Sequence, residues 1–425
     1  MAKPGGDVAR RGALRLIQGV RDGRSLSDQS GALRSLPVAE QARAARLAAE
    51  TLRHQGRADR VIEPLVARKP APQIADVLRL AVVEMLELGA PAHGVVGAAV
   101  DLTRTLGKRG QAAAGMVNAV LRKASAFAGW ADLPPQPLPE WLRDPLVEAY
   151  GGDVMAAIEA AHQRGAPLDL TPRPGAAAVP GADPLPTGSW RIHGPAQVTA
   201  LSGYDVGDWW VQDAAAALPV RLLDPKAGER IADLCAAPGG KTLQLATAKA
   251  EVIAVDINDQ RLKRVAENLA RCGLTARLVA ADALQWRPDV QFDAILLDAP
   301  CSATGTIRRH PDLPFIRDGH GIAELIELQA ALLDHALSLL RPGGRLVFAT
   351  CSLIPDEGEV QIDEALARHP GLTVERPDLT RIDLAGIDPA WITEEGGLRL
   401  RPDFWPDKGG MDGFYMARLR KPGTQ

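Results

Sequence analysis

The sequence has little of what marks several common classes of protein. Aromatic residues make up only 4% of its 425 residues, so we do not expect extensive stacking of bases on aromatic rings. There is no run of about 18 apolar residues, the length that a membrane-spanning helix needs. Met1–Arg15 carries charges but no apolar segment, so no secretory signal is predicted. We therefore expect a cytoplasmic protein without a membrane partner.

Cysteine is also scarce, and its spacing excludes a familiar kind of site. The four cysteines are Cys235, Cys272, Cys301 and Cys351. No two of them form a C-x-x-C pair, so no metal site is expected. In a reducing compartment they should be free thiols rather than a disulfide framework. Each cysteine must then serve either packing or chemistry.

Charge is low overall but unevenly distributed. The net charge of −3 argues against a protein that coats nucleic acid with basic residues. Residues 1–125 nevertheless hold 20 Lys+Arg and 11 Asp+Glu, a balance of +9, and the remainder has a balance of −12. This asymmetry indicates either a polyanion-facing module joined to an acidic catalytic module, or a helical domain with solvated arginine-rich faces.

The first third of the chain has helical periodicity. Residues 8 to about 127 are rich in Ala, Leu, Val and Arg, and apolar residues recur at helical spacing, which predicts an all-α bundle. One such stripe comprises Val77, Leu80, Ala81, Met85 and Leu88. Leu133–Pro139 then holds four prolines in seven residues, which predicts a stiff connector and a domain boundary. We expect an all-α domain at 1–130, a proline-rich linker and small α/β RNA-binding or connecting region of unassigned fold at 131–211, and a third domain at 212–425.

From Glu229 onward short apolar runs alternate with helical patterns. This alternation predicts an α/β, Rossmann-like domain with a doubly wound parallel sheet. The expected strands are Ile231–Cys235, Val252–Ile257, Arg277–Ala281, Ala294–Leu297 and Arg345–Thr350. The expected helices are Lys241–Lys249, Asp259–Cys272 and Ile322–Leu340.

A glycine-rich turn follows the first of these strands. Gly239 and Gly240 would let the backbone approach a ligand closely just before a helix begins. The turn does not match the Walker phosphate-binding pattern, and no second dinucleotide fingerprint is present, so an adenosyl cofactor such as S-adenosylmethionine fits better. Asp256, Asp282 and Asp298 end the next three strands, at the sheet edge where ligands of such folds bind.

An aspartate at a junction between a strand and a helix can instead be a helix N-cap. Three aspartates in series after a glycine turn favour ligand binding over capping. The expected cofactor contacts are Cys235, Ala236, Ala237, Pro238, Gly239, Gly240, Lys241, Asp256, Asp282 and Asp298.

Two cysteines also follow strands of the predicted sheet. Cys301 comes after the fourth strand and Cys351 directly after the later strand that ends at Thr350, so both thiols should point into the crevice of the cofactor. Methylation at C5 of a cytosine needs a thiolate that adds at C6, a group that neutralises charge on the ring, and a base or elimination catalyst. Cys351, Asp298 and Cys301 can fill these three places.

Two of these groups would need tuning by their surroundings. To bond N3 of the base, Asp298 must be protonated, so a raised pKa is expected; a bond to the exocyclic amine is the alternative. A nearby cation should favour a thiolate, and Lys241 and Arg308 are the candidates.

These motifs together resemble those of a known family. The segments that carry the resemblance are Val117–Arg122, Asp233–Thr242, Asp298–Ser302, Ile307–Asp312, Ala349–Ser352 and Met411–Phe414. The first is similar to the NusB-type RNA-binding domain, and the others to RNA cytosine-C5 methyltransferases of the Sun/Fmu (RsmB) type. The resemblance spans nearly the whole chain, and the two cysteine motifs together are specific.

The resemblance implies a NusB-like bundle followed by a class I S-adenosylmethionine-dependent methyltransferase domain. It implies that Cys351 forms a covalent adduct with the base, that Cys301 assists its breakdown, and that the substrate is small-subunit ribosomal RNA. We expect the chain to act as a monomer. One segment departs from the pattern, because Leu168–Arg173 stands where the family usually has Arg-Val-Asn, which leaves RNA contacts there open.

The target base must be unstacked, either in a single strand or flipped out of a helix. Arg308 and Arg309 follow the loop of Cys301 and could bind phosphates, and His310 could stack or donate a hydrogen bond. The alternative for these three residues is a solvated basic turn.

Three other functions stay open at this point. The first is a tRNA cytosine-C5 methyltransferase. The second is a DNA cytosine methyltransferase, in which Cys301 would be the attacking thiol. The third is a non-catalytic RNA-binding assembly factor that keeps an inactive methyltransferase domain.

Overall fold

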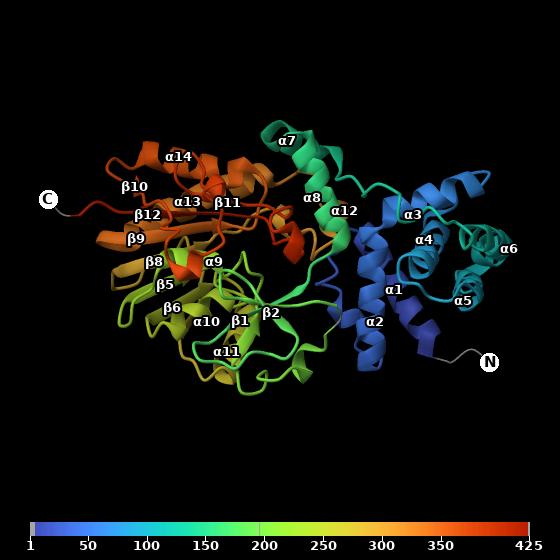
Figure 1. Cartoon of the computed structure of the whole chain (residues 1–425), viewed down its shortest axis with the longest axis horizontal. Helices are drawn as coiled ribbons and strands as arrows, with labels where there is room; N and C mark the ends of the chain where they lie inside the picture. Colours follow the sequence, from blue (N-terminus) through green and yellow to red (C-terminus); the bar gives the residue numbers. More distant parts are fainter. Residues whose placement is uncertain (1–4, 195, 424–425) are drawn as a thin grey trace. The chain divides into compact units, whose positions relative to one another are not determined.

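The structure, a computed structural model, describes residues 5–194 and 196–423. The chain forms two compact units (Figure 1). The first runs to Gly165 and also includes Ile307–Gly319, whereas the second comprises Ala166–Thr306 and the chain from His320 onward. Among the described residues, no helix is long and apolar enough to cross a membrane.

The first unit is built on a bundle of helices, as predicted. Its helices are α1 (Gly5–Arg21), α2 (Val38–Arg53), α3 (Gln55–Ile62), α4 (Pro72–Leu86), α5 (Ala92–Arg104) and α6 (Gly107–Ala124). Helix α4 is its centre, because it is buried on nearly all sides and packs against each of the other five. Val77, Leu80, Ala81 and Met85 of the predicted stripe are buried there, and Leu88 packs against the same core.

The proline-rich segment lies within this unit and does not separate two units. It leads into α7 (Glu140–Tyr150) and α8 (Gly152–Arg164). Gly56 N donates to Gln136 Oε1 at 2.7 Å, and Leu138 N donates to Glu159 Oε1 at 2.9 Å, so the segment is fixed to helices on both sides. The boundary between the units falls at Gly165, which differs from the predicted boundary near residue 130.

The second unit begins with a small antiparallel sheet, in the region whose fold the sequence left unassigned. Its strands are β1 (Leu168–Pro172), β2 (Ala182–Pro184), β3 (Trp190–Ile192) and β4 (Trp209–Val211), in the order β2-β3-β1-β4. Asp169 is fully buried and pairs with Arg191 Nε at 2.6 Å. This ion pair gives the segment Leu168–Arg173 a structural role, since Asp169 also accepts from Ala214 N at 3.0 Å.

The main sheet has eight strands. They are β5 (Arg230–Leu234), β6 (Glu251–Asp256), β7 (Arg277–Ala280), β8 (Phe292–Asp298), β9 (Leu340–Thr350), β10 (Thr373–Val374), β11 (Leu398–Leu400) and β12 (Phe414–Arg420). The order is β10-β12-β9-β8-β5-β6-β7, with β11 beside β12. Strands β5 to β9 are parallel, which confirms the five predicted strands and their arrangement. Strand β12 runs antiparallel to β9, so the sheet is mixed and not wholly parallel.

Helices cover both faces of this sheet (Figure 1). They are α9 (Leu218–Leu223), α10 (Gly240–Thr247), α11 (Asp259–Arg271), α13 (Ile322–Leu339) and α14 (Glu359–Arg368). The inner strands are apolar on both sides: Ile295 and Leu297 belong to the core under α13, whereas Ala294 and Leu296 belong to the core under α9. Burial on both faces explains why these strands read as continuous apolar runs in the sequence.

Candidate active site

The glycine-rich turn connects β5 to α10. Gly239 has a φ of +102°, and a Cβ atom there would lie only 2.9 Å from the side chain of Val265. A Cβ atom at Gly240 would lie 3.2 Å from the side chain of Gln212. Position 239 therefore requires glycine, both for its backbone conformation and for space. The turn lies between a strand and a helix, the context in which such a turn holds a ligand.

The carboxylates of Asp256 and Asp282 stand at the predicted strand ends, but both already accept hydrogen bonds from the backbone. Asp256 accepts from Ala237 N at 3.0 Å and from Asn258 N at 2.9 Å, and Asp282 accepts from Leu284 N at 2.9 Å. The N-cap of α11 is Asn258, not an aspartate. Asp256 thus ties the glycine turn to the end of β6, while each carboxylate oxygen keeps a second lone pair for a ligand hydroxyl.

Asp298, at the end of β8, pairs with a lysine from the glycine turn. Lys241 Nζ lies 2.7 Å from Asp298 Oδ2 and 5.2 Å from the centroid of the Phe414 ring. The remaining lone pairs of the Asp298 carboxyl group can accept a hydrogen bond from an exocyclic amine, one of the two contacts expected for this residue.

The two predicted thiols meet. Strands β8 and β9 are parallel neighbours with Asp298 opposite Ala349, so the segments that follow them leave the sheet side by side. Cys301 Sγ lies 3.5 Å from Cys351 Sγ, and both residues are partly buried. Sequence positions 50 residues apart are thus brought into direct contact.

The environments of the other cysteines distinguish them from this pair. Burial raises the pKa of the Cys235 thiol to about 12. Cys272 is fully buried in an apolar cluster, and burial raises its pKa too. The hydrogen bond with Cys351, followed by burial, raises the pKa of the Cys301 thiol. Cys301 is therefore held as a thiol that can donate its hydrogen to Cys351.

The contact between the thiols predicts that they can be oxidised to a disulfide. A disulfide bond is about 2.05 Å long, so the two sulfur atoms need to approach each other by less than the length of that bond. Hydrogen peroxide should convert the two thiols to a disulfide and two molecules of water, and dithiothreitol should reverse the reaction. We expect mass spectrometry after peroxide to show a peptide cross-link between residues 301 and 351. A cross-link that includes Cys235 or Cys272 instead would contradict the geometry.

A buried carboxylate that sequence reasoning missed lies behind the thiols. Glu357 is fully buried. Its Oε1 accepts from Ser302 N at 2.8 Å and from Gln329 Nε2 at 3.0 Å. Its Oε2 accepts from Ser352 Oγ at 2.6 Å and from Ser302 Oγ. The two serines directly follow Cys301 and Cys351, so Glu357 links the two cysteine segments.

A close approach of two glycines was also missed. Gly413 N donates to Gly305 O at 2.8 Å, and Gly305 N donates to Cys351 O at 2.9 Å. A Cβ atom at Gly305 would lie 2.0 Å from Gly413 O, so no larger residue fits. Gly413 belongs to the segment Met411–Phe414, and this contact gives that motif a role. It holds the turn after Cys301 against the end of β9.

Asp233, within β5, is a buried acid with an altered proton affinity. Its Oδ2 accepts from Thr242 Oγ1 at 2.6 Å, and the residue is fully buried. Burial raises the pKa of Asp233 to about 7, and the negative charges of Asp298 and Asp256 act in the same direction.

This raised pKa predicts a pH-dependent contribution to stability. The ordinary pKa is 3.8, so between about pH 4 and pH 7 the folded state holds a proton that the unfolded state has lost. The stabilisation is fully present below about pH 4 and is lost as the pH rises through 7. Asp233→Asn keeps an acceptor for Thr242 without a charge. The difference in Tm, variant minus wild type, should therefore rise between pH 5 and pH 8 by roughly 2 °C or more. A constant difference would contradict the pKa, and Asp289→Asn, at an exposed position, is the control.

The predicted RNA contacts Arg308, Arg309 and His310 lie in the first unit, which does not contain the thiols. Arg308 is fully buried, and its carbonyl oxygen accepts from Arg53 Nη1 at 2.8 Å. This burial corrects the expectation that Arg308 binds a phosphate directly. Arg309 is partly exposed and His310 is exposed, so their contact with RNA stays a prediction. Within the described residues there is no cluster of side chains that could hold a metal ion.

The parallel strands, the glycine turn and the helices on both faces define a Rossmann-like methyltransferase domain. Residues 220–420 match the family described as 16S rRNA methyltransferase RsmB/F, and residues 7–126 match the NusB family. A protein of Erwinia tasmaniensis named Ribosomal RNA small subunit methyltransferase B is 39% identical over 360 residues, which cover 78% of each chain. A protein of the same name from Vibrio cholerae is 39% identical over 357 residues, which cover 78% of this chain and 77% of that one. The chain belongs to the RsmB/F family of methyltransferases.

Solved structures agree with this assignment. The one titled "Crystal Structure of PH0851" has a TM-score of 0.73 and 25% identity and covers 99% of this chain and 100% of its own. A methyltransferase homologue from Pyrococcus horikoshii has a TM-score of 0.55 and 28% identity and covers 65% of this chain and 93% of its own.

Proposed function

We propose that the chain uses S-adenosylmethionine to methylate C5 of a cytosine in small-subunit ribosomal RNA through a covalent adduct with Cys351. The observation that carries this proposal is the pair of thiols 3.5 Å apart at the ends of adjacent strands, one of which also ends in Asp298. The names of the relatives support a ribosomal substrate.

The residues around the glycine turn fit an adenosyl cofactor. Because Gly239 has no side chain, its backbone is accessible to a ligand at a position where a side chain has no space. Asp256 keeps lone pairs for ribose hydroxyls. Asp282, with the segment from Cys235 to Lys241, would complete the contacts. When bound, S-adenosylmethionine supplies a methyl group on a sulfonium ion, the electrophile that C5 of the base needs. The other groups of the reaction belong to the chain and to the base.

Cys351 would start the reaction on the base. Its thiolate adds to C6, which forms a C–S bond and moves the electron pair of the C5–C6 double bond onto C5. Asp298 accepts a hydrogen bond from the exocyclic amine and orients the ring. Lys241, in its ion pair with Asp298, balances the negative charge in the site.

Release of the methylated base needs loss of the C5 proton and departure of Cys351. The C5–H electron pair restores the double bond to C6, the proton passes to water, and Cys351 leaves as a thiolate. Cys301, whose Sγ lies 3.5 Å from that of Cys351, assists this elimination, either as the base for the C5 proton or as the donor of a hydrogen bond to the departing sulfur.

The nucleoside product tests the proposal directly. The full-length protein is incubated with methyl-labelled S-adenosylmethionine and separately with small-subunit ribosomal RNA, tRNA or DNA, and the products are digested and identified by mass spectrometry. We expect 5-methylcytidine in the ribosomal RNA. Label in another nucleoside would contradict C5 chemistry, and label in tRNA alone would change the substrate. No binding of S-adenosylmethionine in calorimetry would favour a non-catalytic assembly factor.

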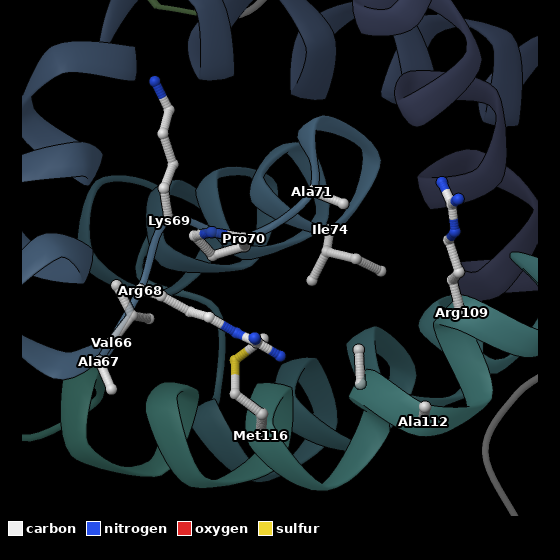
Figure 2. Close-up of a pocket in the computed structure, with 11 residues that line it drawn as sticks. Val66, Ala67, Arg68, Lys69, Pro70, Ala71, Ile74, Arg109, Ala112 and Met116 are labelled. Atoms are coloured by element: carbon white, nitrogen blue, oxygen red, sulfur yellow. The ribbon is translucent and has the colours of Figure 1, made fainter.

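A cavity in the first unit is suited to part of the RNA. It has a volume of about 640 Å³ and lies between residues 66–71 and helix α6 (Figure 2). Ile74, Ala112 and Met116 give it an apolar lining, and the exposed cations Arg68, Lys69 and Arg109 stand around them. A single strand needs both kinds of surface, because its bases contact apolar groups and its phosphates contact cations.

The charges around this cavity are uncompensated. Elsewhere in the unit arginines pair with acids, as Arg79 does with Asp59 at 2.7 Å. Within the described residues, no carboxylate lies at ion-pair distance from Arg68, Lys69 or Arg109, and no acid lines the cavity. Helices α4 and α6 also begin here, and neither has an acidic residue in its first turn. We infer that the cavity binds phosphates of the RNA.

A further inference from the structure

Glu357 is an unusual group to find behind two thiols. It lies at the end of a short 3-10 helix, η5 (Pro355–Glu357), and is fully buried. Burial of a carboxylate is costly unless donors surround it. The donors here are all uncharged: a backbone amide, an amide side chain and two hydroxyl groups. Among the residues that the structure describes, the donors that hold the Glu357 carboxyl group are therefore uncharged, and no cation is hydrogen-bonded to it.

The donors come from three separate parts of the fold. Ser302 follows Cys301 in the segment after β8, and Ser352 follows Cys351 in the segment after β9. Gln329 comes from helix α13, and it also donates to Pro300 O at 2.8 Å. In addition, Thr350 Oγ1 donates to the carbonyl oxygen of Glu357 at 2.7 Å. A change at Glu357 would thus reach both thiols at once.

The charge of Glu357 also acts on Cys301. It opposes a negative charge on Cys301, in the same direction as Cys351 and burial do. The two sulfur atoms lie 3.5 Å apart, so a negative charge that opposes ionisation of Cys301 leaves its hydrogen available for a hydrogen bond to Cys351. Geometry and charge therefore act together at this position.

We propose that Glu357 is a positioning residue that fixes the two cysteine segments against each other and disfavours a negative charge on Cys301, so that Cys351 is the more reactive thiol. This inference rests on the proposed function, because it explains how two like thiols acquire different roles. Glu357 acts through Ser302 and Ser352 and does not itself touch the base.

The test compares the reactivity of the two thiols without cofactor or RNA. Full-length protein is treated with limiting iodoacetamide at pH 7.5, digested with trypsin, and the modified fractions of Cys301 and Cys351 are measured by mass spectrometry. In the wild type we expect label mainly on Cys351. In Glu357→Gln, which keeps the size and removes the charge, the ratio of label on Cys301 to label on Cys351 should rise at least fivefold. Glu357→Asp, which keeps the charge, should restore most of the selectivity.

Two controls keep the result decisive. Glu364→Gln makes the same chemical change at an exposed position of α14 and should leave the ratio as in the wild type. An unchanged ratio in Glu357→Gln would overturn the proposal. If Glu357→Gln does not fold, Ser352→Ala serves as the second variant, because it removes one donor to Glu357 and leaves the carboxyl group in place. In Ser352→Ala, Cys301 should still react with iodoacetamide more slowly than Cys351. A Cys301 that reacts faster than Cys351 would overturn the proposal equally.

The same proteins separate this inference from the proposed function. Covalent adduct formation by the wild type with RNA tests the proposed function alone. A wild type that forms no adduct, together with the expected shift of label in Glu357→Gln, would reject the reaction but keep the role of Glu357 in thiol protonation. An adduct with an unchanged label ratio would reject only the role of Glu357.

Discussion

Replacement of Cys351 by alanine is expected to abolish both methylation and the covalent RNA adduct, whereas Cys301→Ala should let the adduct accumulate. Without the sulfur of Cys351 no bond to C6 forms, and loss of a nucleophile typically lowers the rate by about 10³-fold or more. Without Cys301 the adduct still forms, but the departing sulfur lacks the neighbouring thiol, 3.5 Å away, that assists its release. A denaturing gel with labelled RNA distinguishes the two outcomes.

The control and the contrary result are equally specific. Cys272→Ala changes a buried cysteine in a separate apolar cluster and should leave adduct formation and turnover near the wild-type level. The reverse pattern, with an adduct that requires Cys301 and persists without Cys351, would assign the attack to the thiol after β8. That is the arrangement expected for a DNA cytosine methyltransferase.

Reversal of the three cations around the cavity should weaken RNA binding strongly. The test is a triple variant that combines Arg68→Glu, Lys69→Glu and Arg109→Glu. We expect its affinity for a ribosomal RNA fragment to fall at least about tenfold in 0.1 M salt, because three phosphate contacts are lost and repulsion replaces them. Three contacts contribute about 2 to the slope of log K against log salt for a single strand, so the slope should become shallower by that amount. Fluorescence anisotropy across a salt series measures both quantities.

A control variant with the same change in charge shows whether the effect belongs to the cavity or to the net charge of the first unit. Arg34→Glu, Arg122→Glu, Lys123→Glu changes three exposed cations of the same unit that do not line the cavity. It should weaken binding less and change the slope less. Equal losses in the two variants would show that only the net charge of the unit matters. The label ratio of the two thiols should be unchanged in both.

The sequence predicted the elements whose burial produces a regular pattern. Strands β5 to β9 are buried on both faces and bounded by helices, so their apolar runs were visible. Strand β12 was missed because it follows a long irregular segment and pairs antiparallel with β9, outside the alternation of strands and helices. The sheet of β1 to β4 was missed because three of its strands have only three residues, too few to show a period.

The sequence predicted those residues of the site that lie at or directly after the end of a strand. Asp298 and the two cysteines follow apolar strands, and parallel neighbours bring such positions together. Glu357 gave no such signal, because its donors come from segments after β8 and β9 and from α13. Arg308 was expected to bind a phosphate because it follows the loop of Cys301, whereas its side chain is fully buried, and burial depends on tertiary packing.

The way in which the chain divides between the two units affects how the protein can fold during its synthesis. The chain passes between the units three times, at Gly165, Thr306 and Gly319. Residues 307–319 complete the first unit, where Asp312 accepts from Leu26 N at 2.8 Å and Arg308 O accepts from Arg53. During synthesis the N-terminal unit therefore lacks part of its structure until about three quarters of the chain has left the ribosome. A fragment cut at residue 166 would separate this segment from its partners in the first unit.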